Sequence, residues 1–193
     1  MMADYVVVGA GIAGASVAYH LALQGQVLLL ERESQPGYHS TGRSAAMFME
    51  TYGTAAIRAL TRASRAFYEQ PPAHFTDHPI LTPRGAMHVA KTGQESELAS
   101  AWDAATQSSS RVELLSVPEV LERCPVLRAE LTCGAIYEPD AMDMDVHALH
   151  QGYLRGFRAR GGQVMGNAEL ASAQRGPSGW MVVLVDGRTL QAP

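Results

Sequence analysis

The sequence predicts an α/β fold in which a parallel β-α-β unit opens the chain and β-rich segments follow it. Three observations support this class: residues 4–8 form a short β-branched run, residues 12–23 repeat apolar side chains at helical spacing, and residues 26–31 form a second apolar run. Hydrophobic residues make up 47% of the 193 residues and charged residues 18%, so a buried core can form. The length predicts one domain and part of a second.

The overall charge is weakly acidic and excludes one class of function. The chain has 15 Lys and Arg residues against 19 Asp and Glu residues, and no basic run that could neutralise a row of phosphates, so we expect no nucleic-acid partner. Cys124 and Cys133 form no CxxC pair, so neither a metal site nor a disulfide is predicted. The first apolar stretch lacks a basic leader and is interrupted by glycines. We therefore expect a cytoplasmic protein without a transmembrane segment.

The elements at the start of the chain can be justified in order. The strand at residues 4–8 is expected to be buried on both faces, as in the interior of a parallel sheet. A glycine-rich turn leads into the helix over 12–23, and a strand over 26–31 completes the β-α-β unit. Thr54 is then predicted to cap a helix that Pro71 and Pro72 stop.

The middle of the chain predicts a separate sheet, and helical periodicity returns after it. Strands are predicted at 81–92, 111–115 and 131–137, with helices near 96–105 and after Ser116. A helix over 145–160 and strands at 163–166, 170–174, 180–185 and 189–191 follow.

The turn after the first strand has the pattern G-x-G-x-x-G, formed by Gly9, Gly11 and Gly14. The pattern alone is a weak signal, but here it follows a strand, opens a helix and is answered by Glu31 at the end of the next strand. Gly9 permits the tight turn, Gly11 lets backbone amides approach a pyrophosphate, and Gly14 lets the helix press on the strand. Glu31 would accept hydrogen bonds from ribose hydroxyls. The alternative is a glycine turn without a ligand and a solvent-facing Glu31.

The polar loop after Glu31 indicates which dinucleotide is bound. Its residues 37–46, Gly-Tyr-His-Ser-Thr-Gly-Arg-Ser-Ala-Ala, resemble the second flavin-contacting segment of the D-amino-acid oxidase superfamily of FAD enzymes. The resemblance implies a Rossmann-like FAD/NAD(P)-binding domain with FAD as its cofactor. The predicted cofactor-binding residues are Gly9, Gly11, Ile12, Ala13, Gly14, Glu31, Arg32, Thr41, Gly42, Arg43, Ser44, Ala45, Ala46 and Leu170. For Arg43 the alternative is an ion pair with a nearby carboxylate.

The resemblance covers essentially the whole chain and is strongest toward the D-arginine dehydrogenases of that superfamily. Tyr52 matches an active-site tyrosine and is the predicted catalytic residue, while a residue placed like Leu170 gives backbone contacts to adenine. In those enzymes a His stands at the position of Met47, and a Glu that binds the substrate guanidinium stands at that of Ala86. A buried guanidinium without a carboxylate partner is costly. We therefore expect a neutral or apolar substrate.

The resemblance implies an FAD-dependent oxidoreductase that oxidises the C–N bond of an amino acid or related amine, giving an imino acid that hydrolyses to a 2-oxo acid and ammonia. Its partners would be that small-molecule substrate and an electron acceptor of unknown identity. Residues 1–70 are expected to form a β-α-β part of the FAD-binding domain, 71–142 part of a substrate domain, and 143–193 a return to the first domain.

Enzymes of this superfamily run to nearly twice the present length. We therefore expect the FAD-binding domain to be truncated, the 193 residues alone to be inactive, and self-association or a missing second half to cover the exposed apolar surface. Two alternatives are an NAD-linked Rossmann dehydrogenase and a non-catalytic nucleotide-binding fragment that needs a partner chain.

The remaining polar residues have ordinary structural interpretations. The histidines at 20, 147 and 150 are expected to be packed or surface residues rather than ligands. Asp140, Asp143 and Asp145 alternate with other residues in a way that suggests calcium, but the glycine and distal Glu of an EF-type loop are missing, so helix capping is favoured.

Overall fold

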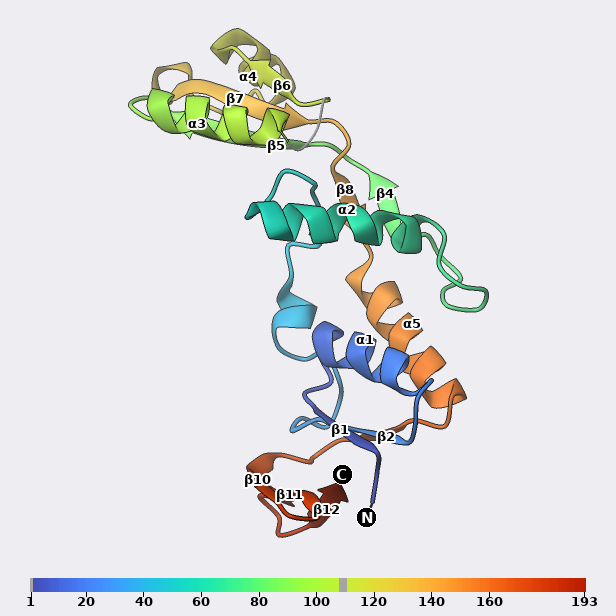
Figure 1. Cartoon of the computed structure of the whole chain (residues 1–193). Helices are drawn as coiled ribbons and strands as arrows, with labels where there is room; N and C mark the ends of the chain where they lie inside the picture. The colour runs from blue at the N-terminus through green and yellow to red at the C-terminus, as the bar shows by residue number, and fades with distance from the viewer. Residues whose placement is uncertain (1, 108–110) are drawn as a thin grey trace. The chain divides into compact units, whose positions relative to one another are not determined.

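The computed structural model describes residues 2–107 and 111–193, which form two compact units (Figure 1). The first unit comprises the chain up to Ala45 together with Pro71–Ile80 and Asp145–Pro193, and the second comprises Ala46–Gln70 and Leu81–Met144. These units are divided at other residues than the functional segments 1–70, 71–142 and 143–193, and that functional division stays a prediction. The mixed α/β class is confirmed.

The first unit is built on a parallel sheet with the strand order β1-β2-β9. Its strands are β1 (Tyr5–Val8), β2 (Val27–Leu30) and β9 (Gln163–Met165). All four residues of the central strand β2 are buried. The expectation that β1 is buried on both faces is wrong, because β1 lies at the edge of this sheet and Val8 is 54% exposed.

Two helices belong to this sheet, α1 (Ile12–Leu21) and α5 (Val146–Ala159). They pack closely because α5 carries glycine where α1 presents an aromatic ring: a Cβ on Gly156 would lie 2.3 Å from the Cε2 atom of Tyr19. The guanidinium of Arg160 also stacks on this ring, 3.6 Å from the centroid of Tyr19. Such close packing fixes α5 against the helix that follows the glycine turn.

A second, antiparallel sheet completes the unit, with the order β10-β11-β12. Its strands are β10 (Leu170–Gly176), β11 (Gly179–Leu184) and β12 (Thr189–Ala192). Leu28 and Leu30 of β2 share a buried cluster with Leu184 and Leu190 of this sheet. The start of β10 is therefore held beside the end of β2, where the site described below is formed.

The second unit contains two three-stranded sheets, where the sequence predicted one. One sheet has the order β3-β8-β4 and the other β5-β7-β6. The strands are β3 (Met47–Phe48), β8 (Met142–Met144), β4 (Leu81–Pro83), β5 (Ala86–Lys91), β7 (Thr132–Glu138) and β6 (Glu113–Leu115). β3 and β8 were not predicted, since two or three residues show no periodicity.

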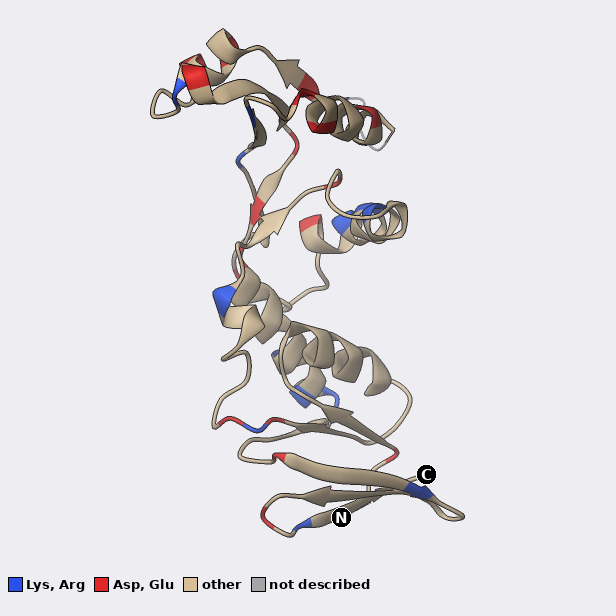
Figure 2. Ribbon diagram, turned by 90° about the vertical axis from the view of Figure 1, so that its left-hand side faces the viewer, with Lys and Arg blue, Asp and Glu red and all other residues tan. Residues whose placement is uncertain are grey.

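The helices of the second unit are α2 (Ala55–Glu69), α3 (Glu95–Thr106) and α4 (Val117–Arg123). Short 3-10 helices are η1 (Ser40–Arg43) in the first unit and η2 (Ala129–Leu131) in the second. The hydroxyl of Thr54 accepts a hydrogen bond from the amide of Ile57, so the predicted cap of α2 is confirmed. In Figure 2 the ribbon of α2 is blue at its basic residues, and acidic residues colour parts of α3 red. Within the described residues, no helix is long and apolar enough to span a membrane.

Candidate functional site: a dinucleotide pocket at the glycine-rich turn

The glycine-rich turn has the geometry that its sequence predicts. Gly9 has a φ of 91°, in the region that favours glycine, and its amide donates to the carbonyl oxygen of Leu30 at 2.7 Å. Gly14 faces the carbonyl oxygen of Gly9 so closely that no side chain fits between them. The turn therefore brings the first residues of α1 to the end of β2, which is how a dinucleotide-binding loop is built.

Glu31 at the end of β2 is buried, with 7% of its surface exposed. One carboxylate oxygen accepts the amide of Ala10 at 2.9 Å, and the other accepts the amide of Glu33 at 3.1 Å. Its backbone pairs with the next segment of the site, since the amide of Ala168 donates to the Glu31 carbonyl oxygen at 2.8 Å. The alternative of a solvent-facing Glu31 is wrong. The residue connects the glycine turn, the following loop and the start of β10.

The loop after Glu31 folds back over the N-terminus of α1. The amide of Gly42 donates to the carbonyl oxygen of Gly37 at 2.9 Å, which closes the loop at η1. This places the Thr41 hydroxyl oxygen 2.9 Å from the amide of Ile12, from which it accepts a hydrogen bond. Thr41 thus interacts with the first turn of α1, where backbone amides and the helix dipole favour an acceptor or an anion.

Three side chains of the loop after Glu31, those of Arg32, Glu33 and His39, contact one another. His39 Nε2 lies 2.7 Å from a carboxylate oxygen of Glu33 and 3.0 Å from a guanidinium nitrogen of Arg32. The hydrogen bond with His39 is the main reason that the pKa of Glu33 is lowered, and the charges of His39 and Arg32 lower it further. The carboxylate of Glu33 therefore stays ionised beside Arg32.

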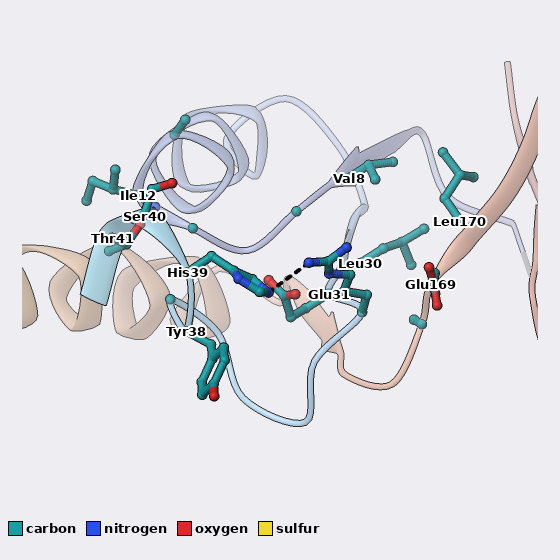
Figure 3. Close-up of a pocket in the computed structure, with 16 residues that line it drawn as sticks. Val8, Ile12, Leu30, Glu31, Tyr38, His39, Ser40, Thr41, Glu169 and Leu170 are labelled. Carbon is teal, nitrogen blue, oxygen red and sulfur yellow. Dashed lines mark hydrogen bonds between the residues drawn. The ribbon is translucent and has the colours of Figure 1, made fainter. Parts of the chain in front are cut away.

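The turn, the loop and the start of β10 enclose a pocket of about 510 Å³, within the range of roughly 300–1,000 Å³ typical of ligand sites. The predicted residues that line it are Gly9, Gly11, Ile12, Ala13, Glu31, Arg32, Thr41 and Leu170. The lining residues that were not predicted are Val8, Leu30, Gly37, Tyr38, His39, Ser40, Ala168 and Glu169. In Figure 3, Val8, Leu30 and Leu170 lie at one end and Ser40 and Thr41 at the other, with Glu31 between them.

The remaining predicted residues lie outside the pocket lining. Gly14 packs against the carbonyl oxygen of Gly9. Gly42 and Arg43 lie in η1, and Ser44 and Ala45 directly follow it. The guanidinium of Arg43 lies 5.6 Å from the centroid of the Tyr38 ring, so the structure shows a cation–π contact. Ala46 has a φ of 56° and lies in the second unit with Tyr52, whose side chain is 68% exposed. Their roles toward a cofactor or substrate stay predictions.

The histidines and the acidic residues near 140 can now be placed. His20 and His147 are exposed, whereas His150 is buried and its Nε2 lies 2.8 Å from the carbonyl oxygen of Ala10. Asp145 caps α5, accepting the amide of Ala148 at 2.7 Å, as predicted. Asp143 and Asp140 instead form ion pairs with Arg84 and Arg111. His150 is therefore a packed residue, as expected, but its contact with the glycine turn was not predicted, although its position on the apolar face of α5 was a usable signal.

Chemically, this pocket suits a ligand with an apolar ring at one end and an anion at the other. The apolar end has the character that suits a planar base, the carboxylate of Glu31 is adjacent to the middle, and the N-terminus of α1 favours negative charge. In the described residues the Gly11 amide donates to no protein acceptor, so a donor is left for a ligand. The residues present therefore fit the adenosine and pyrophosphate of a dinucleotide.

Comparison with known proteins identifies the class. The family model "FAD dependent oxidoreductase" (DAO) matches residues 4–192. The chain is 26% identical over 202 residues to L-2-hydroxyglutarate dehydrogenase of Escherichia coli (strain K12), covering 99% of this chain and 46% of that protein. It is 26% identical over 189 residues to monomeric sarcosine oxidase of Bacillus sp. (strain B-0618), covering 95% and 48%.

The fold agrees with that family. The crystal structure of glycine oxidase from Geobacillus kaustophilus superposes with a TM-score of 0.83 at 22% identity, over 99% of this chain and 53% of that one. The chain belongs to the DAO family of FAD-dependent oxidoreductases, whose cofactor is FAD. It spans about half the length of the curated relatives that it matches. The predicted family, the Rossmann-like fold and FAD are confirmed.

Proposed function

We propose that this chain supplies the FAD-binding pocket of an enzyme that oxidises the C–N bond of a neutral or apolar amino acid or related amine. One observation supports the FAD part of this proposal: the glycine turn, Glu31 and the η1 loop all line the same pocket. The NAD alternative is disfavoured by family membership and by the η1 loop, which resembles a flavin-contacting segment.

Different residues of the pocket would bind different parts of FAD. Val8, Leu30 and Leu170 would hold the adenine, the carboxylate of Glu31 would accept the ribose hydroxyls, and Gly11 with the N-terminus of α1 would bind the pyrophosphate. Each Glu31 oxygen has a free lone pair after accepting one amide, so the carboxylate can accept a further hydrogen bond. Thr41 keeps its hydroxyl proton, which can be donated to a phosphate oxygen.

FAD, when bound, supplies the hydride acceptor for the oxidation. The substrate would lose its α-hydrogen with two electrons and a proton from nitrogen, so that the single C–N bond becomes a C=N bond. Water would then hydrolyse this imine to a 2-oxo acid and ammonia. We assign Tyr52 the role of contacting the substrate, since it matches an active-site tyrosine in the similar enzymes.

Two substitutions relative to the D-arginine dehydrogenases support a neutral or apolar substrate. Met47 and Ala86 are both partly buried, and neither could pair with a guanidinium. Similarity to sarcosine oxidase supports an amine substrate. A second candidate, oxidation of a 2-hydroxy acid, is favoured by the similarity to L-2-hydroxyglutarate dehydrogenase over 99% of the chain.

An absorption spectrum followed by anaerobic substrate addition tests the proposal. The purified protein should be yellow, with a flavin spectrum. In an intact enzyme that contains this chain, the visible absorbance should bleach with D-leucine or D-methionine faster than with D-arginine. Bleaching by L-2-hydroxyglutarate without bleaching by any amine would establish the second candidate instead. A protein that binds NAD and no flavin would overturn both.

A further inference from the structure

The glycine-rich turn is held by a histidine from a distant part of the chain. His150 on α5 is 3% exposed, and its Nε2 lies 2.8 Å from the carbonyl oxygen of Ala10. A carbonyl oxygen can only accept, so Nε2 carries the hydrogen and donates it. Burial lowers the pKa of His150 from its ordinary value of 6.5, so the ring is neutral at pH 7. The neutral ring is therefore the Nε2–H tautomer.

With this hydrogen bond, both backbone polar groups of Ala10 have a side-chain partner. The residue is fully buried, and its amide donates to Glu31 Oε2 at 2.9 Å while its carbonyl accepts from His150. A peptide group is planar and trans, so its carbonyl and the following N–H point in opposite directions. By holding the Ala10 carbonyl toward α5, His150 directs the Gly11 N–H away from α5. Gly11 lines the pocket.

His150 also contacts the second loop of the pocket. Gly37 has a φ of 81°, and a Cβ placed on it would lie 2.9 Å from Cε1 of His150 and 3.2 Å from Nδ1. Gly37 in turn accepts the amide of Gly42 and so closes the turn that carries Thr41. One side chain thus touches both loops from which the pocket is formed.

We propose that His150 is a positioning residue for FAD: it orients the Ala10–Gly11 peptide so that the Gly11 amide can donate to the cofactor pyrophosphate, and it supports the Gly37 loop opposite. This inference rests on the proposed function, because it needs a pyrophosphate in the pocket. The imidazole itself does not touch the ligand; it acts through Ala10 and Gly37.

Three substitutions separate the hydrogen bond from the volume of the ring. His150→Gln places an amide nitrogen near the position of Nε2 and keeps the donor. His150→Asn places its amide nitrogen nearer the position of Nδ1 and so does not reach Ala10, and His150→Leu removes the donor. His147→Leu is the matched control, since His147 is an exposed histidine on the same helix.

FAD, ADP and adenosine titrations of these variants test the inference. We expect His150→Asn and His150→Leu to weaken FAD and ADP binding by about 3- to 10-fold, the value of one hydrogen bond. His150→Gln and His147→Leu should stay within about twofold of the unmodified protein. Adenosine affinity should be the same in all variants, because adenosine has no phosphate, whereas a general loss of folding would weaken all three ligands.

The outcomes distinguish this inference from the proposed function. If the unmodified protein binds neither FAD nor ADP, the proposed function fails and this inference with it. If it binds both and the Asn and Leu variants bind them equally well, or if adenosine loses as much affinity as ADP, only the role of His150 is overturned. Histidine ¹⁵N NMR of the unmodified protein adds a check that needs no variant: an Nδ1–H tautomer of His150 would exclude the bond to Ala10.

Discussion

The carbonyl oxygen of Gly9 lies where a side chain on Gly14 would begin, since a Cβ added to Gly14 would be 1.8 Å from that oxygen. Both positions are backbone, so neither can turn aside as a flexible side chain would. The contact therefore ties the start of α1 to the glycine turn, and it sets the distance between the helix N-terminus and the pocket.

Gly14→Ala should displace α1 from the turn. We expect a loss of about 1–3 kcal/mol in the free energy of unfolding, the range for overpacking a tight contact, together with weaker FAD binding. Urea denaturation and FAD titration measure both quantities. Gly176→Ala is the control, because the nearest atom to its added Cβ is 3.8 Å away. Equal stability of the two variants would contradict the contact.

Glu31→Gln should weaken FAD binding by about 1–3 kcal/mol, the cost of leaving a partner of a charged group unsatisfied. Both carboxylate oxygens accept backbone amides, so replacing one oxygen with an NH2 group turns an attraction into a clash of two donors. Glu169→Gln is the control, because Glu169 is exposed and lines the same pocket. FAD affinity unchanged in the Glu31 variant would remove Glu31 from the cofactor site.

Stability should fall as the pH is lowered through the ordinary pKa of histidine. His150 has a pKa below 6.5, first because it is buried, with His147 and Arg158 lowering it further and the Ala10 carbonyl and Glu31 opposing this. The unfolded chain then binds the proton first, so the free energy of unfolding decreases as the pH falls below about 7 and levels off below the folded-state pKa.

Urea denaturation at several pH values checks this dependence. His150→Gln should remove the part of the slope that comes from His150. A slope that is the same in both would show that His150 does not titrate in this window.

Thr51→Val should destabilise the second unit by about 1.5–3 kcal/mol, the value of a hydrogen bond to a charged group. The Thr51 hydroxyl donates to the carboxylate of Glu138, which is 1% exposed and also accepts the amide of Glu50 at 2.8 Å. Thr82→Val, at an exposed position of β4, is the control and should change stability by less than about 0.5 kcal/mol. Thermal or urea unfolding measures the difference.

Ala86→Glu should shift the substrate preference toward D-arginine. The added carboxylate would give the guanidinium of D-arginine a charged partner. A binding pocket discriminates a charged group more strongly than one methylene group. The ratio of the anaerobic bleaching rates with D-arginine and D-leucine, in an intact enzyme that contains this chain, is the measurement, and Ala86→Gln, which is uncharged, is the control. An equal ratio in the two variants would place Ala86 away from the substrate.

Much of the fold could be predicted because its local signals are strong. The helix of α5 and the strands on either side of the glycine turn follow from periodicity, and the structure confirms them. What the sequence missed depends on distant pairing: β3 pairs with β8 through Met47 and Asp143, and so short a pairing leaves no pattern. The burial of β1 was misjudged because an apolar run does not reveal whether its strand is central or at an edge.

In the candidate site, too, some residues follow from local sequence and others are brought in by pairing of distant segments. Gly9, Gly11 and Glu31 belong to one contiguous motif, so their positions in the pocket follow from local geometry. Ala168 and Glu169 reach the pocket only because β9 pairs with β2 and β10 starts beside it. His150 was treated as one of several ordinary histidines, since the partner that distinguishes it is a backbone carbonyl with no signature in the sequence.

The bond between Ala10 and His150 joins positions 140 residues apart, whereas Glu31 and Ala10 are separated by 21. The bond to Glu31 lies within the opening β-α-β unit, whereas the bond to His150 requires a much longer loop to close and α5 to pack against that unit. During synthesis the complete glycine fingerprint leaves the ribosome well before α5. A nascent chain that ends before α5 consequently carries the whole glycine fingerprint but leaves the Ala10 carbonyl oxygen without its donor from His150.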